Sequence, residues 1–350
     1  MNEIKKILIL RLSAIGDTIH TLPLVNALKK TYPDCKIGWV VEDKAELFVK
    51  NNPNIDNCYV IPQKIWKKRS FSLQNIKEFF EIINNINKEN YDIVFDTQQL
   101  LKSSIILPFL NIKRKITLSG GREFSWIFAN EIIKSKHALF DPNYHVVKRN
   151  LEFAKYIGAN DFEIKFLMKN SDEKIKAKIS DLLKKIDPKK PTVVLSPATT
   201  WKNKHWQESY WSQVLDFLDQ KANIIFTGTN ADVALIGRIF ANSSAKEITI
   251  LAGQTNLEEL AEVFCRADVV ISPDSGSAHI AWATSKPYVI ALFTATAAGR
   301  NAPFGENCTV LTPNLACHPC MKKKCRQKDK NLCTKSITPE KVIEVLEKIL

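Results

Sequence analysis

The chain has 350 residues, 45% of them hydrophobic, and its 50 Lys and Arg residues against 37 Asp and Glu give a formal net charge of +13. This length allows two domains with separate cores, and the apolar content excludes a disordered chain. The basic excess favours an anionic partner, such as nucleic acid, a phosphorylated substrate or an anionic membrane, although a generally basic proteome would leave the same composition. The sequence contains no run of about 18 apolar residues, so no transmembrane helix is expected. The N-terminus also lacks the cleavage site of a signal peptide.

Short apolar runs rich in Ile and Val alternate with amphipathic stretches in the first half of the chain. Because the runs are apolar on both faces, they are typical of parallel strands covered by helices on each side. The predicted strands are 6–12, 36–41, 59–62, 92–96 and 115–118, and the predicted helices include 18–31 and 72–87.

The second half repeats this alternation. Its predicted strands are 192–196, 223–227, 248–252, 268–272 and 288–293, and its predicted helices are 207–218, 231–240, 257–265 and 277–284. The polar stretch from 158 to about 176 is interpreted as a linker. A last helix covers 338–350, where Thr338 is suited to the N-cap and Pro339 to the first turn.

The predicted fold class is therefore α/β, with two doubly wound, Rossmann-like parallel-sheet domains that face each other across a cleft. The predicted domains are 1–165 and 166–337. The helix 338–350 is expected either to pack back on the N-terminal domain or to stay with the C-terminal domain. Ligands bind such sheets at the carboxyl ends of the strands. The turn after the first strand lacks G-x-G-x-x-G, which argues against nicotinamide binding through that motif.

The first turn, residues 13–17, places Asp17 at the start of a helix, and Gly16 permits a sharp turn. The turn alone favours an ordinary N-cap without catalytic duty. The helix dipole keeps such a carboxylate ionised, however, and an ionised carboxylate at a cleft is what a general base requires. His20, one turn later, would help to position it, although a lone His is more often structural.

The strongest local signal is DVVISPDSGSAH at 268–279. A buried strand ends there, Asp274 lies in the turn, and Ser275–Ser277 open a helix whose free amides form a cradle for phosphate. His279 follows on the same helix face and would reach a phosphate or ribose oxygen. The alternative is an ordinary strand–turn–helix with an Asp cap.

A third segment, SPATTWKNKHW at 196–206, follows the first strand of the second half. Thr199 and Thr200 offer hydroxyl groups, and Lys204, with Lys202, offers the positive charge that suits a pyrophosphate. A solvated basic loop is the alternative. After the next strand, Asp232 either accepts a hydrogen bond from a ribose or sugar hydroxyl or caps its helix.

Basic residues in the first half point to an anionic, partly apolar ligand. Lys102 lies just beyond a strand end, Arg122 adds charge, and the segment 64–69 forms a basic loop with Trp66 inside it. This pattern fits a ligand at a membrane surface with Trp66 as an interfacial anchor. A solvated charged loop is an equal alternative for 64–69.

Four of the eight cysteines gather near the C-terminus, as C-x2-C-x4-C-x7-C at Cys317, Cys320, Cys325 and Cys333. Four thiolates suit a structural zinc site. The second pair is more widely spaced than in zinc ribbons, so free thiols in a loop remain the default interpretation and no metal is assigned.

Four segments carry a resemblance to a known family: 11–23 (RLSAIGDTIHTLP), 91–104, 198–206 and 273–279. They resemble the bacterial ADP-heptose-using heptosyltransferases, which have the GT-B fold. The resemblance implies an inverting glycosyltransferase that moves L-glycero-D-manno-heptose from ADP-heptose to the Kdo residue of Kdo-lipid A, in the inner core of lipopolysaccharide or lipooligosaccharide. The first and third segments look most like enzymes that add the first heptose, whereas the cysteine cluster looks more like those that add the second.

The resemblance also implies roles for residues. Asp17 would be the general base, with an acceptor site in the N-terminal domain and an ADP-heptose site in the C-terminal domain. The implied donor-binding residues are Thr199, Thr200, Lys204, Asp232, Asp274, Ser275, Gly276 and His279, with Thr255 added by spacing, and the implied acceptor-binding residues are Ser13, Gly16, Lys102 and Arg122. The loop 294–300 departs from the T-D-P that family members often have there.

The resemblance also implies the surroundings of the protein. No cofactor is required, because a helix N-terminus and Lys204 supply the electrostatic work of a metal. The expected location is the cytoplasm, peripheral on the cytoplasmic face of the inner membrane. Nucleic acid is not expected, because no interleaved aromatic–basic platform occurs. A non-catalytic protein that binds nucleotide sugars is the alternative from a different class.

Overall fold

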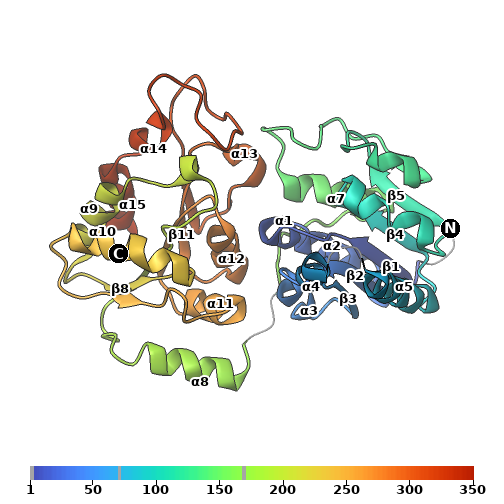
Figure 1. Cartoon of the computed structure of the whole chain (residues 1–350), viewed down its shortest axis with the longest axis horizontal. Coiled ribbons are helices and arrows are strands. Elements are labelled where there is room, and N and C mark those ends of the chain that lie inside the picture. The colour runs from blue at the N-terminus through green and yellow to red at the C-terminus, as the bar shows by residue number, and fades with distance from the viewer. Residues whose placement is uncertain (1–3, 70–71, 168–170) are drawn as a thin grey trace. The chain divides into compact units, whose positions relative to one another are not determined.

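The computed structural model describes residues 4–69, 72–167 and 171–350. The chain divides into two compact units, Met1–Lys169 and Asn170–Leu350. Each unit contains a six-stranded parallel sheet with helices on both faces (Figure 1). The predicted α/β class with two doubly wound parallel sheets is confirmed. The observed boundary falls a few residues after the expected one, within a linker of which residues 168–170 lie outside the described residues.

The sheet of the first unit has the order β3-β2-β1-β4-β5-β6. Its strands are β1 (Lys6–Leu10), β2 (Lys36–Glu42), β3 (Asn57–Ile61), β4 (Ile93–Asp96), β5 (Arg114–Leu118) and β6 (Glu131–Ile133). Its helices are α1 (Ile15–Ile19), α2 (Leu22–Thr31), α3 (Glu46–Lys50), α4 (Gln63–Arg69), α5 (Leu73–Lys88), α6 (Leu101–Ser104) and α7 (Val146–Tyr156), with short 3-10 turns η1 (Leu107–Phe109) and η2 (Ser125–Phe128).

The central strands of this sheet are continuous hydrophobic runs because helices cover both of their faces. Ile7–Leu10 of β1 and Ile93–Phe95 of β4 are fully buried. The predicted helix 18–31 is two helices, α1 and α2, which meet at Thr21. The basic segment 64–69, expected to be a loop, is helical and lies within α4.

The sheet of the second unit has the order β12-β11-β10-β7-β8-β9. Its strands are β7 (Thr192–Leu195), β8 (Asn223–Phe226), β9 (Thr249–Ile250), β10 (Val269–Pro273), β11 (Tyr288–Leu292) and β12 (Cys308–Leu311). Its helices are α8 (Glu173–Leu182), α9 (Glu208–Leu218), α10 (Val233–Ala241), α11 (Leu257–Cys265), α12 (Gly276–Thr284), α13 (Ala298–Asn301), α14 (Leu332–Ser336) and α15 (Pro339–Ile349), with 3-10 turns η3 (Lys202–Lys204) and η4 (Asn230–Asp232).

The C-terminal helix α15 belongs to the core of the second unit. Val342 and Leu346 are fully buried in a cluster that also contains Trp206 and Trp211, and α15 packs on α9. The Trp206 indole N–H donates to the Ile337 carbonyl at 2.7 Å, which fixes the approach to this helix. The apolar face that would have packed back on the N-terminal domain is therefore occupied within the second unit.

Candidate functional site

Both sheets reverse their strand order between two central strands, β1 and β4 in the first unit and β7 and β10 in the second. Loops that leave adjacent parallel strands in opposite directions open a crevice at the carboxyl end, where ligands of such folds bind. The sequence segments singled out above follow these four strands. Each unit therefore has its own candidate site, and each is described separately.

Asp17 in the first unit is held by a buried arginine. The Arg11 guanidinium contacts the Asp17 carboxylate at 3.0 Å and donates to the Thr97 carbonyl at the end of β4 at 2.5 Å. The Arg11 side chain is 5% exposed, whereas that of Asp17 is 34% exposed. Arg11 therefore fixes one carboxylate oxygen of Asp17, and the group as a whole still reaches solvent.

The residues around Asp17 take places that differ in part from expectation. Gly16 lies in the first turn of α1, so its backbone is helical and the sharp turn precedes it. His20 is buried and its ring packs edge-to-face on His145 at 5.6 Å between centroids. The positioning partner of Asp17 is Arg11, which sequence reasoning missed although this arginine directly follows a buried strand.

Lys102 joins Ser13 to a buried carboxylate beside this turn. Its ammonium donates to the Ser13 hydroxyl and lies 3.1 Å from Glu42 Oε1. The Glu42 side chain is 5% exposed and also accepts from Gln63 at 3.0 Å. The structure thus brings Ser13 and Lys102 together, and it adds Glu42, an acid at the end of a buried strand that sequence reasoning missed.

The backbone of this turn is tied to the loop after β4. Gln98 Oε1 accepts from the amides of Leu12 at 2.9 Å and Ser13 at 3.2 Å. Arg122 lies on the next loop, where its backbone N–H donates to the Gln99 carbonyl at 3.1 Å and its guanidinium sits 5.2 Å from the centre of the Phe140 ring. Arg122 is therefore engaged with Phe140, whereas Ser13 and Lys102 contact each other directly.

Asp274 is the centre of the site in the second unit. Its Oδ2 lies 2.5 Å from the Lys204 ammonium and accepts from the Thr296 hydroxyl, also at 2.5 Å, and its Oδ1 lies 3.5 Å from His279 Nε2. Lys204 also donates to the Asp274 carbonyl at 3.3 Å, as does the Thr199 hydroxyl. Loops after β7, β10 and β11 therefore converge on one buried carboxylate.

Charge neutralisation dominates the electrostatics of this cluster. Burial by itself would raise the pKa of Asp274, but the hydrogen bond to His279 and the positive charge of Lys204 hold that pKa well below its usual range. Because its carboxylate is shared among protein groups, Asp274 orients Lys204 and His279 in this structure. Thr296, which sequence reasoning missed, donates its hydroxyl hydrogen to Asp274 from the loop after β11.

The N-terminus of α12 is open. Ser275 is the N-cap residue, but its side chain makes no capping hydrogen bond, and its hydroxyl lies 3.0 Å from that of Ser272. A Cβ built on Gly276 meets no atom within 4 Å. The first turn of α12 therefore has open space beside Gly276, which leaves the predicted phosphate cradle unobstructed by a side chain there.

The remaining predicted donor residues lie at the same edge of this sheet but in other roles. Asp232 caps its own turn, since Oδ2 accepts from the Thr229 amide and hydroxyl at 2.7 Å each. Thr200 is exposed beside Thr199, and Thr255 is partly exposed in the loop that leads into α11. The structure brings Thr199, Lys204, Asp274 and His279 into contact, and it leaves these three outside that cluster.

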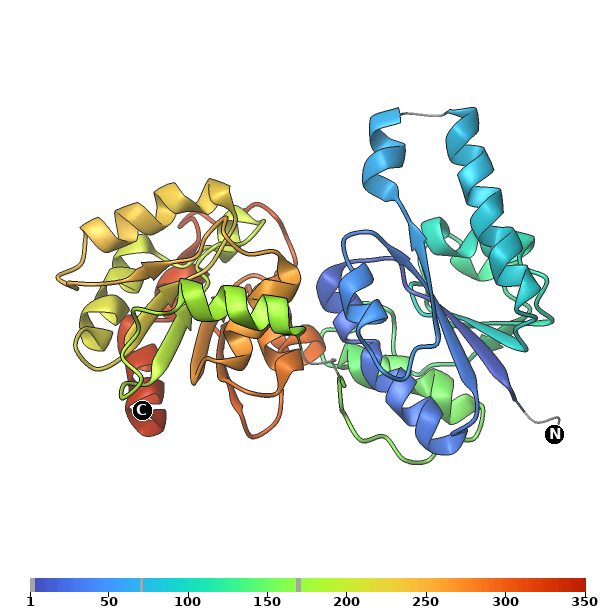
Figure 2. The ribbon, with the colours of Figure 1, turned by 90° about the horizontal axis from the view of Figure 1, so that it is seen from below.

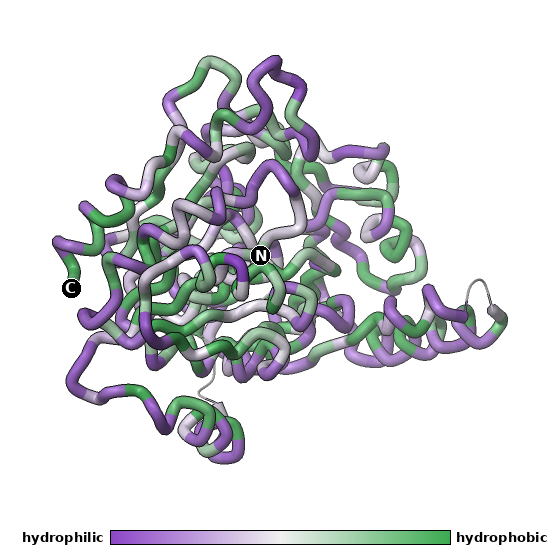
Figure 3. The backbone as a smooth tube through the Cα atoms, turned by 60° about the vertical axis from the view of Figure 1, so that its left-hand side comes forward, coloured by the Kyte–Doolittle hydropathy of each residue, from purple (hydrophilic) through white to green (hydrophobic). Residues whose placement is uncertain are grey.

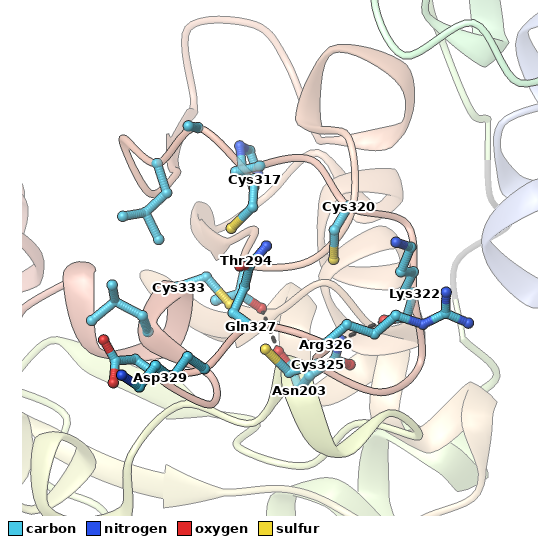
Figure 4. Close-up of a pocket in the computed structure, with 15 residues that line it drawn as sticks. Asn203, Thr294, Cys317, Cys320, Lys322, Cys325, Arg326, Gln327, Asp329 and Cys333 are labelled. Carbon is cyan, nitrogen blue, oxygen red and sulfur yellow. Dashed lines mark hydrogen bonds between the residues drawn. The ribbon is translucent and has the colours of Figure 1, made fainter.

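The four clustered cysteines line one cavity of about 500 Å³ in the loop between β12 and α14 (Figure 4). All of them are free thiols. Within the described residues, no group of three or more His, Cys, Asp or Glu side chains already has the spacing of a metal site.

No helix among residues 4–69, 72–167 and 171–350 is both long and apolar enough to cross a membrane.

Comparison with known proteins places this chain in a family. A model described as glycosyltransferase family 9 (heptosyltransferase) matches residues 79–331. The lipopolysaccharide core heptosyltransferase OpsX of Haemophilus influenzae is 30% identical over 309 residues, which cover 86% of this chain and 82% of that protein. The lipopolysaccharide heptosyltransferase 1 of Pseudomonas aeruginosa is 24% identical over 362 residues, which cover 99% and 98%.

A solved structure supports the same fold. The E. coli heptosyltransferase WaaC with ADP matches this chain with a TM-score of 0.75 at 23% identity, over 99% of this chain and 100% of that one. The architecture of two six-stranded parallel sheets is thus that of the GT-B enzymes.

Proposed function

Because the chain belongs to glycosyltransferase family 9, the heptosyltransferases of lipopolysaccharide core synthesis, we propose that it transfers L-glycero-D-manno-heptose from ADP-heptose to the Kdo residue of Kdo-lipid A. Among the relatives, the name heptosyltransferase 1 and the close resemblance of residues 11–23 support the first heptose over the second. The observation that carries the proposal is the partly exposed Asp17 carboxylate, fixed by buried Arg11 at the strand-order reversal of the first unit.

The donor binds at the second unit in this proposal. The ADP diphosphate lies against the first amides of α12, where Gly276 leaves room and the helix dipole favours negative charge. Lys204 and His279, held by Asp274, face the same strand ends and stabilise the charge that develops as the diphosphate leaves. No metal is needed for this electrostatic role.

The acceptor binds at the first unit. Asp17 takes the proton from the attacking Kdo hydroxyl, whose oxygen bonds to the anomeric carbon of the heptose as the bond to ADP breaks on the opposite face. This in-line displacement inverts the anomeric configuration. Lys102, with Ser13, supplies positive charge for the Kdo carboxylate or the phosphates of lipid A. The proposal requires that both sites contact one pair of substrates.

The general-base role is tested by Asp17→Asn. We expect turnover of ADP-heptose and Kdo-lipid A to fall about 10²–10⁴-fold, because the neutral amide cannot accept the proton. ADP binding, measured by calorimetry, is expected to stay unchanged. Asp34→Asn, on an exposed turn of the same unit, is the matched control and keeps full turnover.

Near-normal turnover of Asp17→Asn would exclude this base. The acceptor is tested by mass spectrometry of products formed from Kdo-lipid A and, separately, from singly heptosylated Kdo-lipid A. Transfer to the second acceptor alone would assign the chain to the second heptose, and ADP-heptose binding without any transfer would favour the non-catalytic alternative.

We also propose that the first unit contacts the cytoplasmic face of the inner membrane, where its acceptor lies. Helices α4 and α5 run side by side and project beyond the sheet (Figure 2). Trp66, expected to be the anchor, donates its indole N–H to Glu78 at 2.7 Å and packs on Phe79, so it joins the two helices instead. Other apolar side chains are the exposed ones on this hairpin, namely Ile65, Leu73, Ile76 and Phe80.

Further exposed apolar side chains lie beside this hairpin and on the segment that contains Lys102. The ring of Phe80 lies 5.5 Å from that of Phe109, and Ile105 and Leu101 follow, on either side of Lys102. Hydrophobic and hydrophilic residues alternate along the projecting helices at the lower right of Figure 3. Apolar side chains flanked by Lys and Arg are typical of a surface that lies in a membrane interface.

The membrane surface is tested by replacing Leu73 and Ile76 with Ser. In a co-sedimentation assay with vesicles of phosphatidylglycerol and phosphatidylethanolamine, the double variant is expected to bind at least about tenfold more weakly than the wild type. Each replaced side chain loses about 1.5 kcal/mol of favourable apolar burial in the membrane. Val233→Ser, which changes an apolar residue of the second unit that is 39% exposed, is the control and leaves binding unchanged. Equal sedimentation of both variants would contradict this surface.

A further inference from the structure

The loop between β12 and α14 lacks an apolar core of its own. Residues 312–331, all of them described, form no helix or strand, and Pro313 is the one buried residue among them. Loops of this length inside a compact domain are uncommon unless they serve a function or are held by additional bonds. Three of the four clustered cysteines, Cys317, Cys320 and Cys325, are among the six partly buried residues of this loop, with Leu315, His318 and Asn331.

The thiols of these cysteines gather around one cavity. In Figure 4, Cys317, Cys320 and Cys325 of the loop and Cys333 of α14 surround the same space. All four cysteines line this one cavity, so their thiols form a single cluster.

The sulfur atom of Cys325 already accepts a backbone hydrogen bond. Its Sγ accepts the Asn331 backbone N–H at 3.4 Å. Amide hydrogen bonds to sulfur are a second layer of support that commonly accompanies metal-bound thiolates.

The surrounding charge fits a tetrathiolate ion. Four thiolates around one divalent metal carry a net charge of −2, which an apolar or acidic loop would disfavour. This loop is instead strongly basic, and its cations are Lys322, Lys323, Lys324, Arg326, Lys328 and Lys330.

We propose that Cys317, Cys320, Cys325 and Cys333 bind one zinc-type divalent metal ion, which closes the loop by drawing the four sulfur atoms into a tetrahedral set. Zinc takes such Cys₄ sets in structural sites and contributes folding free energy directly. The proposal is independent of the transferred sugar and of the acceptor.

The metal loop would support the donor site, because it touches the loops that build it. The Asn203 side chain donates to the Lys322 carbonyl, and the Met321 amide donates to the Ala295 carbonyl at 2.9 Å. Ala295 directly precedes Thr296, the residue that hydrogen-bonds to Asp274. Loss of the metal is therefore expected to loosen this edge of the second unit and to weaken ADP binding.

The test measures metal in untagged, full-length protein by mass spectrometry of elements. We expect about one zinc ion per chain in the wild type, and Cys320→Ser and Cys325→Ser to lose it. Cys265→Ser, an exposed cysteine outside the cluster, keeps it. Replacement by Co²⁺ should give thiolate-to-cobalt charge-transfer absorption, and a strong chelator should lower the melting temperature of the wild type but not that of Cys325→Ser.

Some variants could fail to fold, so binding is also measured on the wild type alone by titrating Co²⁺ into chelator-treated protein. Iron at the same stoichiometry, lost in the same two variants, would support the thiolate site equally. Protein that holds less than about a tenth of a metal ion per chain, binds no Co²⁺ and melts at the same temperature with and without chelator overturns the proposal. So does metal content that survives both cluster substitutions.

Discussion

Asp96, at the end of β4, is a fully buried acid in the first unit. Its Oδ1 accepts from the Gln99 amide at 3.1 Å and the Ser103 hydroxyl at 2.7 Å, while Oδ2 has no hydrogen-bond partner in the described part of the chain. Burial raises the pKa of Asp96 to about 6, against the lowering effect of these hydrogen bonds. The folded protein therefore retains a proton here that the unfolded chain releases at lower pH.

This proton predicts a pH dependence of stability. Between about pH 4 and about pH 6 the folded state binds more protons at Asp96 than the unfolded state, so the free energy of unfolding falls as pH rises. The loss amounts to about 3 kcal/mol and is complete above about pH 6. Urea denaturation across this range checks it: Asp96→Asn removes this slope, and parallel profiles for wild type and variant would contradict it.

At the residue scale, the sequence predicted the charged residues of the two candidate sites better than it predicted the residues that contact them. Asp17, Lys204, Asp274 and His279 stand in recognisable motifs next to strand ends, so their position at the sites was predictable. Arg11 contacts Asp17, which is 6 residues later in the chain, and Thr296 contacts Asp274, which is 22 residues earlier. Such pairs depend on how separate loops are folded together, which local pattern does not specify.

At the scale of elements, the first turn of α12 is the feature that fits a phosphate group. Helices of this kind place their first amides against an anion only if no side chain intervenes. Gly276 meets this condition, because a Cβ there contacts no protein atom and points into open space.

Gly276→Ala is therefore expected to weaken ADP binding at least about tenfold, which corresponds to ~1.4 kcal/mol, while the fold is unaffected or slightly more stable. Gly237→Ala is the matched control, because Gly237 also lies in a helix of the second unit with open space at its Cβ. Calorimetric titration with ADP measures both variants. Equal affinities for the two would exclude the phosphate cradle at α12.

Among the elements, the buried central strands were predicted from the sequence, whereas helix α4 was not. The buried strands β1, β4, β7 and β10 are continuous apolar runs. Helix α4 was expected to be a loop because its charged residues show no apolar face of their own, and its helical form accompanies packing on α5 through Trp66. Tertiary contacts of this kind override a weak local pattern.

At the scale of the whole molecule, the division into two compact units predicts independent folding. Each unit has its own sheet and buried residues, and the second also contains α15. A fragment of residues 171–350 is expected to unfold cooperatively and to bind ADP with an affinity close to that of the full chain. Gly276→Ala should weaken binding in this fragment as it does in the full chain.

Circular dichroism and calorimetry on the fragment check this prediction. A fragment that is unfolded, or that folds but fails to bind ADP, would show that the second unit depends on the first. The two-unit, parallel-sheet fold itself was predictable from sequence, because the repeated alternation of apolar runs and amphipathic segments occurs twice. The packing of α15 was not, because an amphipathic helix shows which face is buried but not against what.

The order of the strands has a consequence for how the protein is made. In the first unit, the Arg11 side chain contacts the carbonyl of Thr97, which is 86 residues later in the chain. In the second unit, Lys204 contacts Asp274, which is 70 residues later. Neither pair forms until the ribosome has delivered its distant half. During translation the Asp17 turn is therefore completed well before the loops around Asp274 exist, so the emerging chain passes through a stage with a finished first sheet and an unbuilt second one.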